Sequence, residues 1–137
     1  TETPRHGEDE RSAMDDREPL TSAVIGAAIE VHRELGPGLL ESVYQSCLEY
    51  ELSLQNIECR TLHRLPLTYK GVELAEYFVI DFYFPGRLVV ELKAVEKILG
   101  VHEAQLLTYM KLTRTPVGLI LNFNVPALKS GIKRMVL

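Results

Sequence analysis

Three charged residues interrupt two apolar segments of the chain. Glu91 and Lys93 stand two positions apart within VVELKAV, and Asp81 stands within FVIDFYF. Side chains two positions apart in a β-strand point to the same face, so Glu91 and Lys93 share one. Charges inside a buried strand are costly unless they are paired or bind a metal. Two carboxylates and a lysine can hold Mg²⁺ and act on a phosphodiester, because the metal polarises the phosphate and activates a water.

The same residues also have a purely structural interpretation. An ion pair of Lys93 with Glu91 or with Asp81, on an exposed face of the sheet, would account for the charges without any chemistry.

The turn at Pro85-Gly86 decides whether Asp81 can join the other two residues. A two-residue turn places Asp81 opposite Val90, on the face away from Glu91. A loop of three or five residues, or a bulge, places Asp81 against Glu91. The catalytic interpretation therefore requires the longer loop.

Hydrophobic periodicity and turn signals predict the elements that position these residues. A first helix, capped by Thr21 or Ser22, runs to about residue 35 and ends at a Gly-Pro-Gly sequence. The order of elements predicts an α/β or α+β fold, with a central mixed sheet flanked by helices. A second helix is expected at about residues 40–54, strands at 63–69, 77–84 and 87–95, a helix at 102–112, a strand at 117–123 and an edge strand at 132–137. On the second helix, Leu40, Val43, Cys47 and Leu48 are expected to face inward.

Composition limits the class of protein. The chain has 137 residues, of which 46% are hydrophobic and 25% charged, as in one ordinary globular domain. No apolar run approaches the roughly 20 residues that span a bilayer, and no secretory signal is visible, so we expect no membrane partner. Cys47 and Cys59 do not form a CxxC pair, which excludes a disulfide scaffold, a zinc finger and a four-cysteine iron–sulfur cluster within this chain. We expect a cytoplasmic location.

The charge is distributed unevenly along the chain. Residues 1–20 carry seven acids and three arginines, whereas residues 21–137 carry twelve charges of each sign. We therefore expect residues 1–19 to be a disordered acidic leader and residues 20–137 to be the domain. A neutral body argues against strong, indiscriminate binding of nucleic acid.

The charged residues and one further motif resemble a known family. Asp81, followed after nine residues by Glu91-Leu92-Lys93, resembles the core motif of the PD-(D/E)XK nuclease superfamily. Gly38-Leu-Leu-Glu41-Ser-Val-Tyr44 resembles the signature of the GxxExxY proteins, which are placed within that superfamily. The strings LGPGLLESVY, VVELKAV and HEAQLLTYMK are also similar to that family, so the resemblance covers about residues 20–137.

The resemblance implies a restriction-endonuclease-like core and a site for Mg²⁺ or Mn²⁺. Asp81 and Glu91 are then metal ligands, Lys93 is the catalytic lysine and Glu41 is an additional acid of the metal site. Gln105 and Tyr109 are similar to a QxxxY element that lies beside the active site of recombination-type exonucleases. The implied activity is hydrolysis of phosphodiester bonds in DNA or RNA.

Alternatives remain open at this point. Glu41 could be a solvated acid near a helix N-terminus, where the helix dipole favours negative charge. Tyr44 could be a core aromatic, and Gln105 and Tyr109 could hydrogen-bond along one helix. The whole domain could be a catalytically inactive binding or assembly module that retains the nuclease fold. A homodimer or a protein partner is possible in either case, since substrate capture by so neutral and short a chain could need a second subunit.

Overall fold

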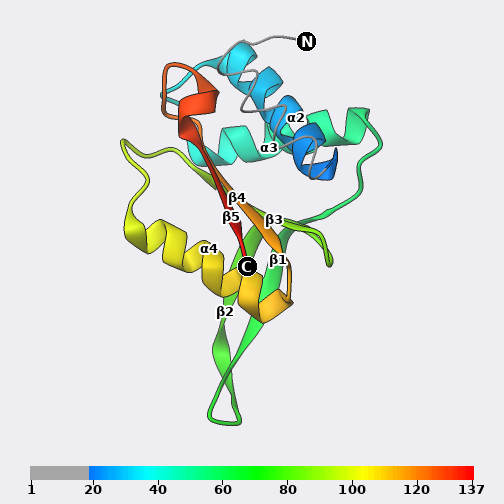
Figure 1. The fold of residues 1–137 in the computed structure, drawn as a ribbon, viewed down its shortest axis with the longest axis vertical. Coiled ribbons are helices and arrows are strands. Elements are labelled where there is room, and N and C mark those ends of the chain that lie inside the picture. Colours follow the sequence, from blue (N-terminus) through cyan, green and yellow to red (C-terminus); the bar gives the residue numbers. More distant parts are fainter. Residues whose placement is uncertain (1–18) are drawn as a thin grey trace.

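The computed structural model describes residues 19–137, and Figure 1 shows their arrangement. The expected leader lies outside the described residues, except Pro19, which begins the first helix. The elements are α2 (Pro19–Leu35), α3 (Glu41–Leu54), β1 (Arg60–Tyr69), β2 (Val72–Phe84), β3 (Leu88–Lys93), α4 (Gly100–Thr113), β4 (Val117–Asn122), the 3₁₀ turn η1 (Leu128–Gly131) and β5 (Ile132–Val136).

The five strands form one mixed sheet with the order β1-β2-β3-β4-β5. β3 and β4 are parallel and are joined through α4, whereas all other neighbours are antiparallel. Figure 1 shows α2 and α3 on one side of the central strands and α4 on the other. The expected α+β architecture, a mixed sheet flanked by helices and consistent with a restriction-endonuclease-like core, is confirmed.

Alternation along β3 divides the apolar residues into two layers. Val90 and Leu92 pack into the larger core beneath α2 and α3, whereas Val89 packs beneath α4 with Leu106 and Met110. Glu91 and Lys93 alternate with Val90 and Leu92, so they share the α4 side with Val89. The site residues of β3 therefore face α4.

Two of the residues that we expected to face inward from the second helix are exposed to solvent instead. Leu40 is 73% exposed and Val43 is 37% exposed. Leu40 precedes the helix as its N-cap residue, so it is not on a helical face. The face that packs inward is centred on Tyr44, Leu48 and Leu52 instead, and Cys47 is half-buried at its edge.

The expected start of the first helix was also wrong. α2 begins at Pro19, so Thr21 and Ser22 lie inside its first turns and do not cap it. Proline suits the first turn of a helix, because its fixed φ is helical and its missing N–H needs no partner there. Within residues 19–137 no helix is both long and apolar enough to cross a membrane.

Candidate active site

The turn between β2 and β3 has the length that the catalytic interpretation requires. Phe84 pairs with Leu88 and Phe82 pairs with Val90, which leaves the three residues 85–87 in the turn. Gly86 adopts a φ of +75°, a left-handed conformation that favours glycine. Continued by one step, this register sets Asp81 opposite Glu91, so the strands bring both carboxylates to one place.

β2 and β3 separate where the two carboxylates meet. The ladder of paired residues ends before Asp81 and Glu91, and each carboxylate instead binds a backbone amide of the opposite strand. The amide N of Asp81 donates to Oε2 of Glu91 at 2.9 Å, and the amide N of Leu92 donates to Oδ2 of Asp81 at 2.8 Å. These reciprocal bonds fix both side chains in the opening between the strands.

Both backbone polar groups of Asp81, the N–H and the C=O, form hydrogen bonds with side chains. Its N–H donates to Glu91, and its carbonyl oxygen accepts a hydrogen bond from Nε2 of Gln45 on α3 at 3.2 Å. On the other side of β2, Leu62 has a φ of +47°, and a pair with Asp81 is missing from the β1–β2 register. Asp81 therefore stands at an irregular point of the sheet, where helix α3 replaces the usual strand contact.

Lys93 reaches toward helix α4. Its Nζ donates to Oε1 of Gln105 at 3.2 Å. Within residues 19–137 no ion pair joins Lys93 to Asp81 or Glu91, so the structural interpretation by a direct ion pair is not supported. The amide of Gln105 therefore fixes the ammonium group beside the carboxylates without neutralising it.

Tyr109 lies one helical turn after Gln105 and closes the site on the α4 side. It is 3% exposed, and its ring packs against Phe78 with the centroids 5.2 Å apart. Burial, together with the charges of Glu91 and Asp81, raises the pKa of Tyr109 to about 12. The hydroxyl is therefore neutral at physiological pH and lies within the electrostatic field of the two carboxylates.

Burial dominates the electrostatics of the carboxylates. Removal from water is the main reason that the pKa of Asp81 is raised to about 6 and the pKa of Glu91 to about 8. The charge of Asp81 contributes to the raised pKa of Glu91, whereas Lys93 lowers the pKa of both groups. Without a cation, the folded protein therefore retains protons here at pH values where isolated carboxyls have lost them.

Glu41 is positioned near the site by the loop before α3, which hydrogen bonds hold in place. The hydroxyl of Tyr44 donates to the carbonyl of Gly36 at 2.6 Å and accepts from the amide N of Leu39 at 3.2 Å. Its ring is fully buried and stacks on Phe123 at a centroid distance of 4.4 Å, so Tyr44 is a core residue. Gly38, with a φ of +95°, allows the turn between them.

The carboxyl of Glu41 therefore lies in the first turn of α3, near the other two acids. Glu41 is exposed as a residue, yet partial burial of its carboxyl raises its pKa, and Lys93 opposes this shift. Its charge also raises the pKa of Asp81 and of Glu91.

The donor set of the site suits a divalent cation. Asp81 and Glu91 each use one carboxylate oxygen for a backbone amide, which leaves a hard oxygen on each for a metal. Among residues 19–137 no three His, Cys, Asp or Glu side chains already form a group that could hold an ion. Glu41 is therefore an electrostatic neighbour of the pair in this geometry, and its role as a ligand stays a prediction.

Two polar residues that support the site were not predicted from the sequence. One is Gln45, whose partner is a backbone carbonyl that no sequence motif reveals. The other is Asn122, which is 2% exposed and binds both the N–H and the C=O of Val95, at 3.0 and 2.9 Å. Asn122 fixes the chain directly after Lys93, and its position within the apolar string VGLILNF is the same kind of signal that identified Asp81.

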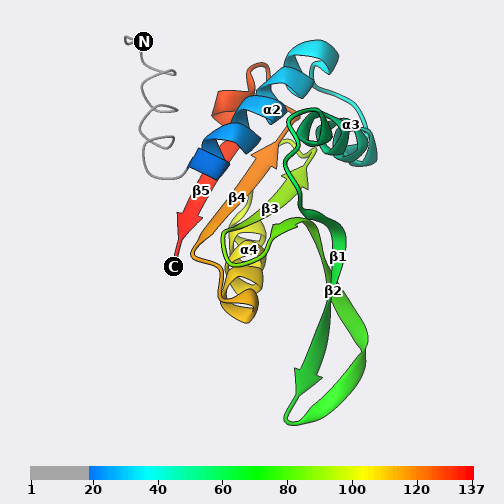
Figure 2. The same cartoon turned by 90° about the vertical axis from the view of Figure 1, so that its right-hand side faces the viewer.

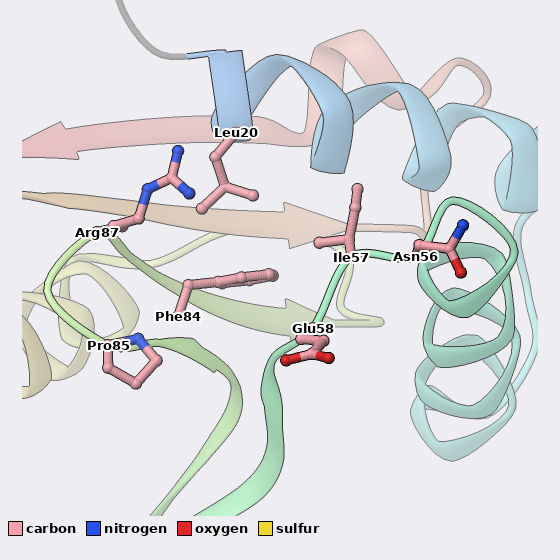
Figure 3. Close-up of a pocket in the computed structure, with 7 residues that line it drawn as sticks. All are labelled: Leu20, Asn56, Ile57, Glu58, Phe84, Pro85 and Arg87. Carbon is pink, nitrogen blue, oxygen red and sulfur yellow. The ribbon is translucent and has the colours of Figure 1, made fainter.

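A separate cavity lies at the other end of the β2–β3 hairpin (Figure 3). It involves none of the predicted site residues. It adjoins the turn at residues 85–87, and the first three residues of β3, 88–90, lie between that turn and Glu91. The residues that line it are Leu20, Asn56, Ile57, Glu58, Phe84, Pro85 and Arg87.

The comparisons agree with this geometry at the level of the superfamily. No curated protein and no solved structure matches the chain. The family model described as the PD-(D/E)XK nuclease superfamily matches residues 18–135, a range that contains every residue of the candidate site. This match does not extend to the GxxExxY group, which stays a prediction. On the evidence of that match, over most of its length, the chain belongs to the PD-(D/E)XK nuclease superfamily.

Proposed function

We propose that the protein is a nuclease of the GxxExxY group that hydrolyses phosphodiester bonds in DNA or RNA with Mg²⁺ or Mn²⁺. Membership of the superfamily supports a nuclease-like function in general. The observation that carries the finer proposal is the carboxylate pair at the separation of β2 and β3, with the ammonium of Lys93 on the same side, held there by Gln105.

The residues divide the work according to their positions. Asp81 and Glu91 would hold the ion with the oxygens that the backbone amides leave unused, and Glu41 would assist from α3. The chemistry that such an ion would supply there is polarisation of the phosphate and a lower pKa of the attacking water. Lys93 orients the attacking water and stabilises the negative charge that develops on the phosphate oxygens. Gln105 positions the ammonium of Lys93, and Tyr109 shapes the pocket wall.

Binding of the ion is coupled to the protonation of Asp81 and Glu91. Metal ligation requires deprotonated carboxylates, whereas burial favours the protonated forms of Asp81 and Glu91. Ion binding therefore releases protons from this pair and strengthens as the pH rises.

Cleavage of a panel of DNA and RNA substrates, single- and double-stranded, with Mg²⁺ or Mn²⁺ tests the proposal. We expect Lys93→Ala to reduce the rate of cleavage by about 10²–10³-fold, because removal of one group that stabilises developing charge typically has an effect of this size. Lys97→Ala is the matched control, because Lys97 is exposed in the segment that follows, and it should retain the parent rate. A parent protein that cleaves nothing, or a Lys93→Ala variant as active as the parent, would refute the nuclease proposal.

The alternative is a binding or assembly module that keeps the fold without catalysis. It is favoured by the lack of a preformed three-ligand group among the described residues and by the backbone amides that already bind one oxygen of each carboxylate. In that case the parent cleaves no substrate, and neither ion stabilises it specifically. A second copy of the chain or another protein is then the expected partner.

A further inference from the structure

The hairpin formed by β1 and β2 extends from the body of the protein as an arm, defined here as residues 60–80. Figure 1 and Figure 2 show its outer half beyond α4 and away from all other elements. β1 is an edge strand, and every residue from 68 to 77 is exposed. Two strands alone are marginally stable in water, so this exposed ribbon contributes little to the core.

Cation–ring contacts concentrate on this arm and its base. Arg64 lies over the ring of Tyr77 at 4.5 Å and Lys70 over the ring of Tyr69 at 5.4 Å. At the base, Arg60 lies over the ring of Tyr83 at 5.8 Å. Such contacts occur about once per 70–80 residues, so three of them within residues 60–83 are unusually dense.

The exposed rings and the cations suit two different parts of a nucleic acid. Tyr69 is 60% exposed and Tyr77 is 44% exposed, and exposed aromatic rings stack on bases regardless of sequence. Arginine and lysine bind phosphate oxygens. A ring contact also holds the long cationic side chain in place, which reduces the entropy lost when it binds phosphate.

The arm also differs from the body in charge. It carries the cations Arg60, Arg64 and Lys70 against the acids Glu73 and Glu76, whereas the rest of residues 21–137 carries nine cations and ten acids. The arm is thus the net positive part of a body that is otherwise slightly negative. This difference favours a polyanion as the ligand.

Pairing with another protein strand is less favourable on the same arm. Pro66 lies within the edge strand β1. Proline has no N–H for a ladder and is one of the devices that prevent edge strands from pairing. The side chains of the arm, rather than its backbone edge, therefore form the contact surface.

We propose that the arm binds a nucleic-acid strand and directs it to Asp81 and Glu91, an inference that rests on the proposed nuclease function. Tyr77 lies four residues before Asp81 on β2, a separation of about 13 Å at the rise of a strand. The tip near Lys70 lies roughly 30 Å away along the strand, which is about nine base pairs of duplex at 3.4 Å each. Substrates of about ten base pairs or more reach the whole arm, and very short ones do not.

Binding without cleavage tests the arm directly. In a Lys93→Ala background and EDTA, fluorescence anisotropy measures the affinity for labelled single-stranded and duplex 20-mers at several salt concentrations. The arm variant combines Arg60→Gln, Arg64→Gln and Lys70→Asn, because asparagine tolerates the φ of +51° at Lys70. The matched control removes three exposed cations elsewhere, with Lys111→Gln, Lys129→Gln and Lys133→Gln.

We expect the arm variant to bind at least tenfold more weakly, with a salt slope reduced by about two to three, since each lost phosphate contact removes about 0.7–0.9. The control variant should retain the parent affinity and slope. A second arm variant, Tyr69→Leu with Tyr77→Leu, should weaken single-strand binding by roughly tenfold or more and leave the salt slope unchanged. Arm substitutions should not change hydrolysis of a small phosphodiester such as bis(p-nitrophenyl) phosphate.

Four results would overturn the proposal: no binding by the parent background, no effect of the arm variants, equal losses in arm and control variants, or a change from dimer to monomer with nucleic-acid binding intact. The last result would identify the arm as a subunit contact. Arm-dependent binding without any cleavage by the Lys93-containing protein would refute the nuclease function alone. Lys93-dependent cleavage with arm-independent binding would refute the arm alone.

Discussion

Strand β2 passes through two contrasting environments. At Asp81 the chain is held by Glu91 and Gln45 through its backbone, next to residues that are fully buried. Ten residues earlier, near Gly71, it forms an exposed ribbon. The same strand thus contains one region whose conformation is fixed by contacts with the core and another region that makes few contacts with the core.

The difference indicates how the fold accommodates a costly site. Buried carboxylates destabilise a protein unless hydrogen bonds compensate for the lost water. At Asp81 and Glu91 the compensation comes from opposing backbone amides and from helices on both sides, so substitutions there affect stability and chemistry together. On the arm, substitutions should affect binding alone. Four measurements of stability test this contrast.

The largest effect is expected at Tyr44, which supports the site from α3. Tyr44→Ala should lower the free energy of unfolding by about 3–5 kcal/mol, because it empties a fully buried aromatic position. Tyr44→Phe should cost about 1–2 kcal/mol, since the Gly36 carbonyl and the Leu39 amide lose their partner. Chemical denaturation measures both values. Tyr50→Ala, on the exposed side of the same helix, is the control and should change stability by less than about 0.5 kcal/mol.

The second effect concerns the metal. A divalent ion that binds only the folded state should stabilise the parent by about 2.7 kcal/mol at a hundred times its dissociation constant. Asp81→Asn should weaken this shift yet leave the metal-free protein as stable or more so, because the amide oxygen can still accept from Leu92 and a repelling charge is lost. Melting curves with and without Mg²⁺ or Mn²⁺, at constant ionic strength, measure the shifts.

Glu73→Gln, on the exposed arm, is the control for the metal shift and should retain it. If neither ion shifts the parent and Asp81→Asn clearly destabilises it, the carboxylates are structural and the binding module becomes the preferred function.

The third effect is a pH dependence of the metal-free protein. The pKa values of Asp81 and Glu91 in the folded state, about 6 and about 8, lie above the value near 4 expected when unfolded. Between these values the folded state holds protons that the unfolded state has lost, so its stability falls as the pH rises. From pH 5 to pH 8 we therefore expect the metal-free parent to lose stability progressively through this pair.

The pH effect is isolated by comparison with a double variant, Asp81→Asn with Glu91→Gln. Thermal unfolding of both proteins in EDTA across pH 5–8 should show a steeper decline in the parent. Parallel declines would mean that the pair does not retain its protons.

The smallest effect is expected on the arm. Arg64→Gln combined with Tyr77→Leu should change the free energy of unfolding by less than about 0.5 kcal/mol, because the arm lies outside the core. Urea denaturation measures the change and its slope. A loss above about 1 kcal/mol would show that the arm is part of the cooperative core, and the contrast between the two regions would fail.

The order of elements and the local relation of Glu91 to Lys93 follow from the sequence alone. Strand parity is local: two residues in one strand share a face whatever packs on them. The apolar strings and the Gly-Pro-Gly break likewise predict the helices and strands, with most boundaries within a few residues. The motif of Asp81, Glu91 and Lys93 was visible for the same reason, since charges inside apolar strands stand out without any knowledge of the fold.

Only the tertiary structure decides where the elements meet. The three-residue turn after Phe84 determines the face of the sheet on which Asp81 lies. Where β2 separates from β3, the carboxylates of Asp81 and Glu91 each bind a backbone amide of the opposite strand. The rotation of α3 exposes Val43 and buries Tyr44 instead. The neighbouring elements decide which face of a helix is covered, and the periodicity of the helix alone does not specify it. Contacts between a side chain and a distant backbone carbonyl, such as Gln45 with Asp81, depend on the relative placement of elements, and no local pattern in the sequence encodes that placement.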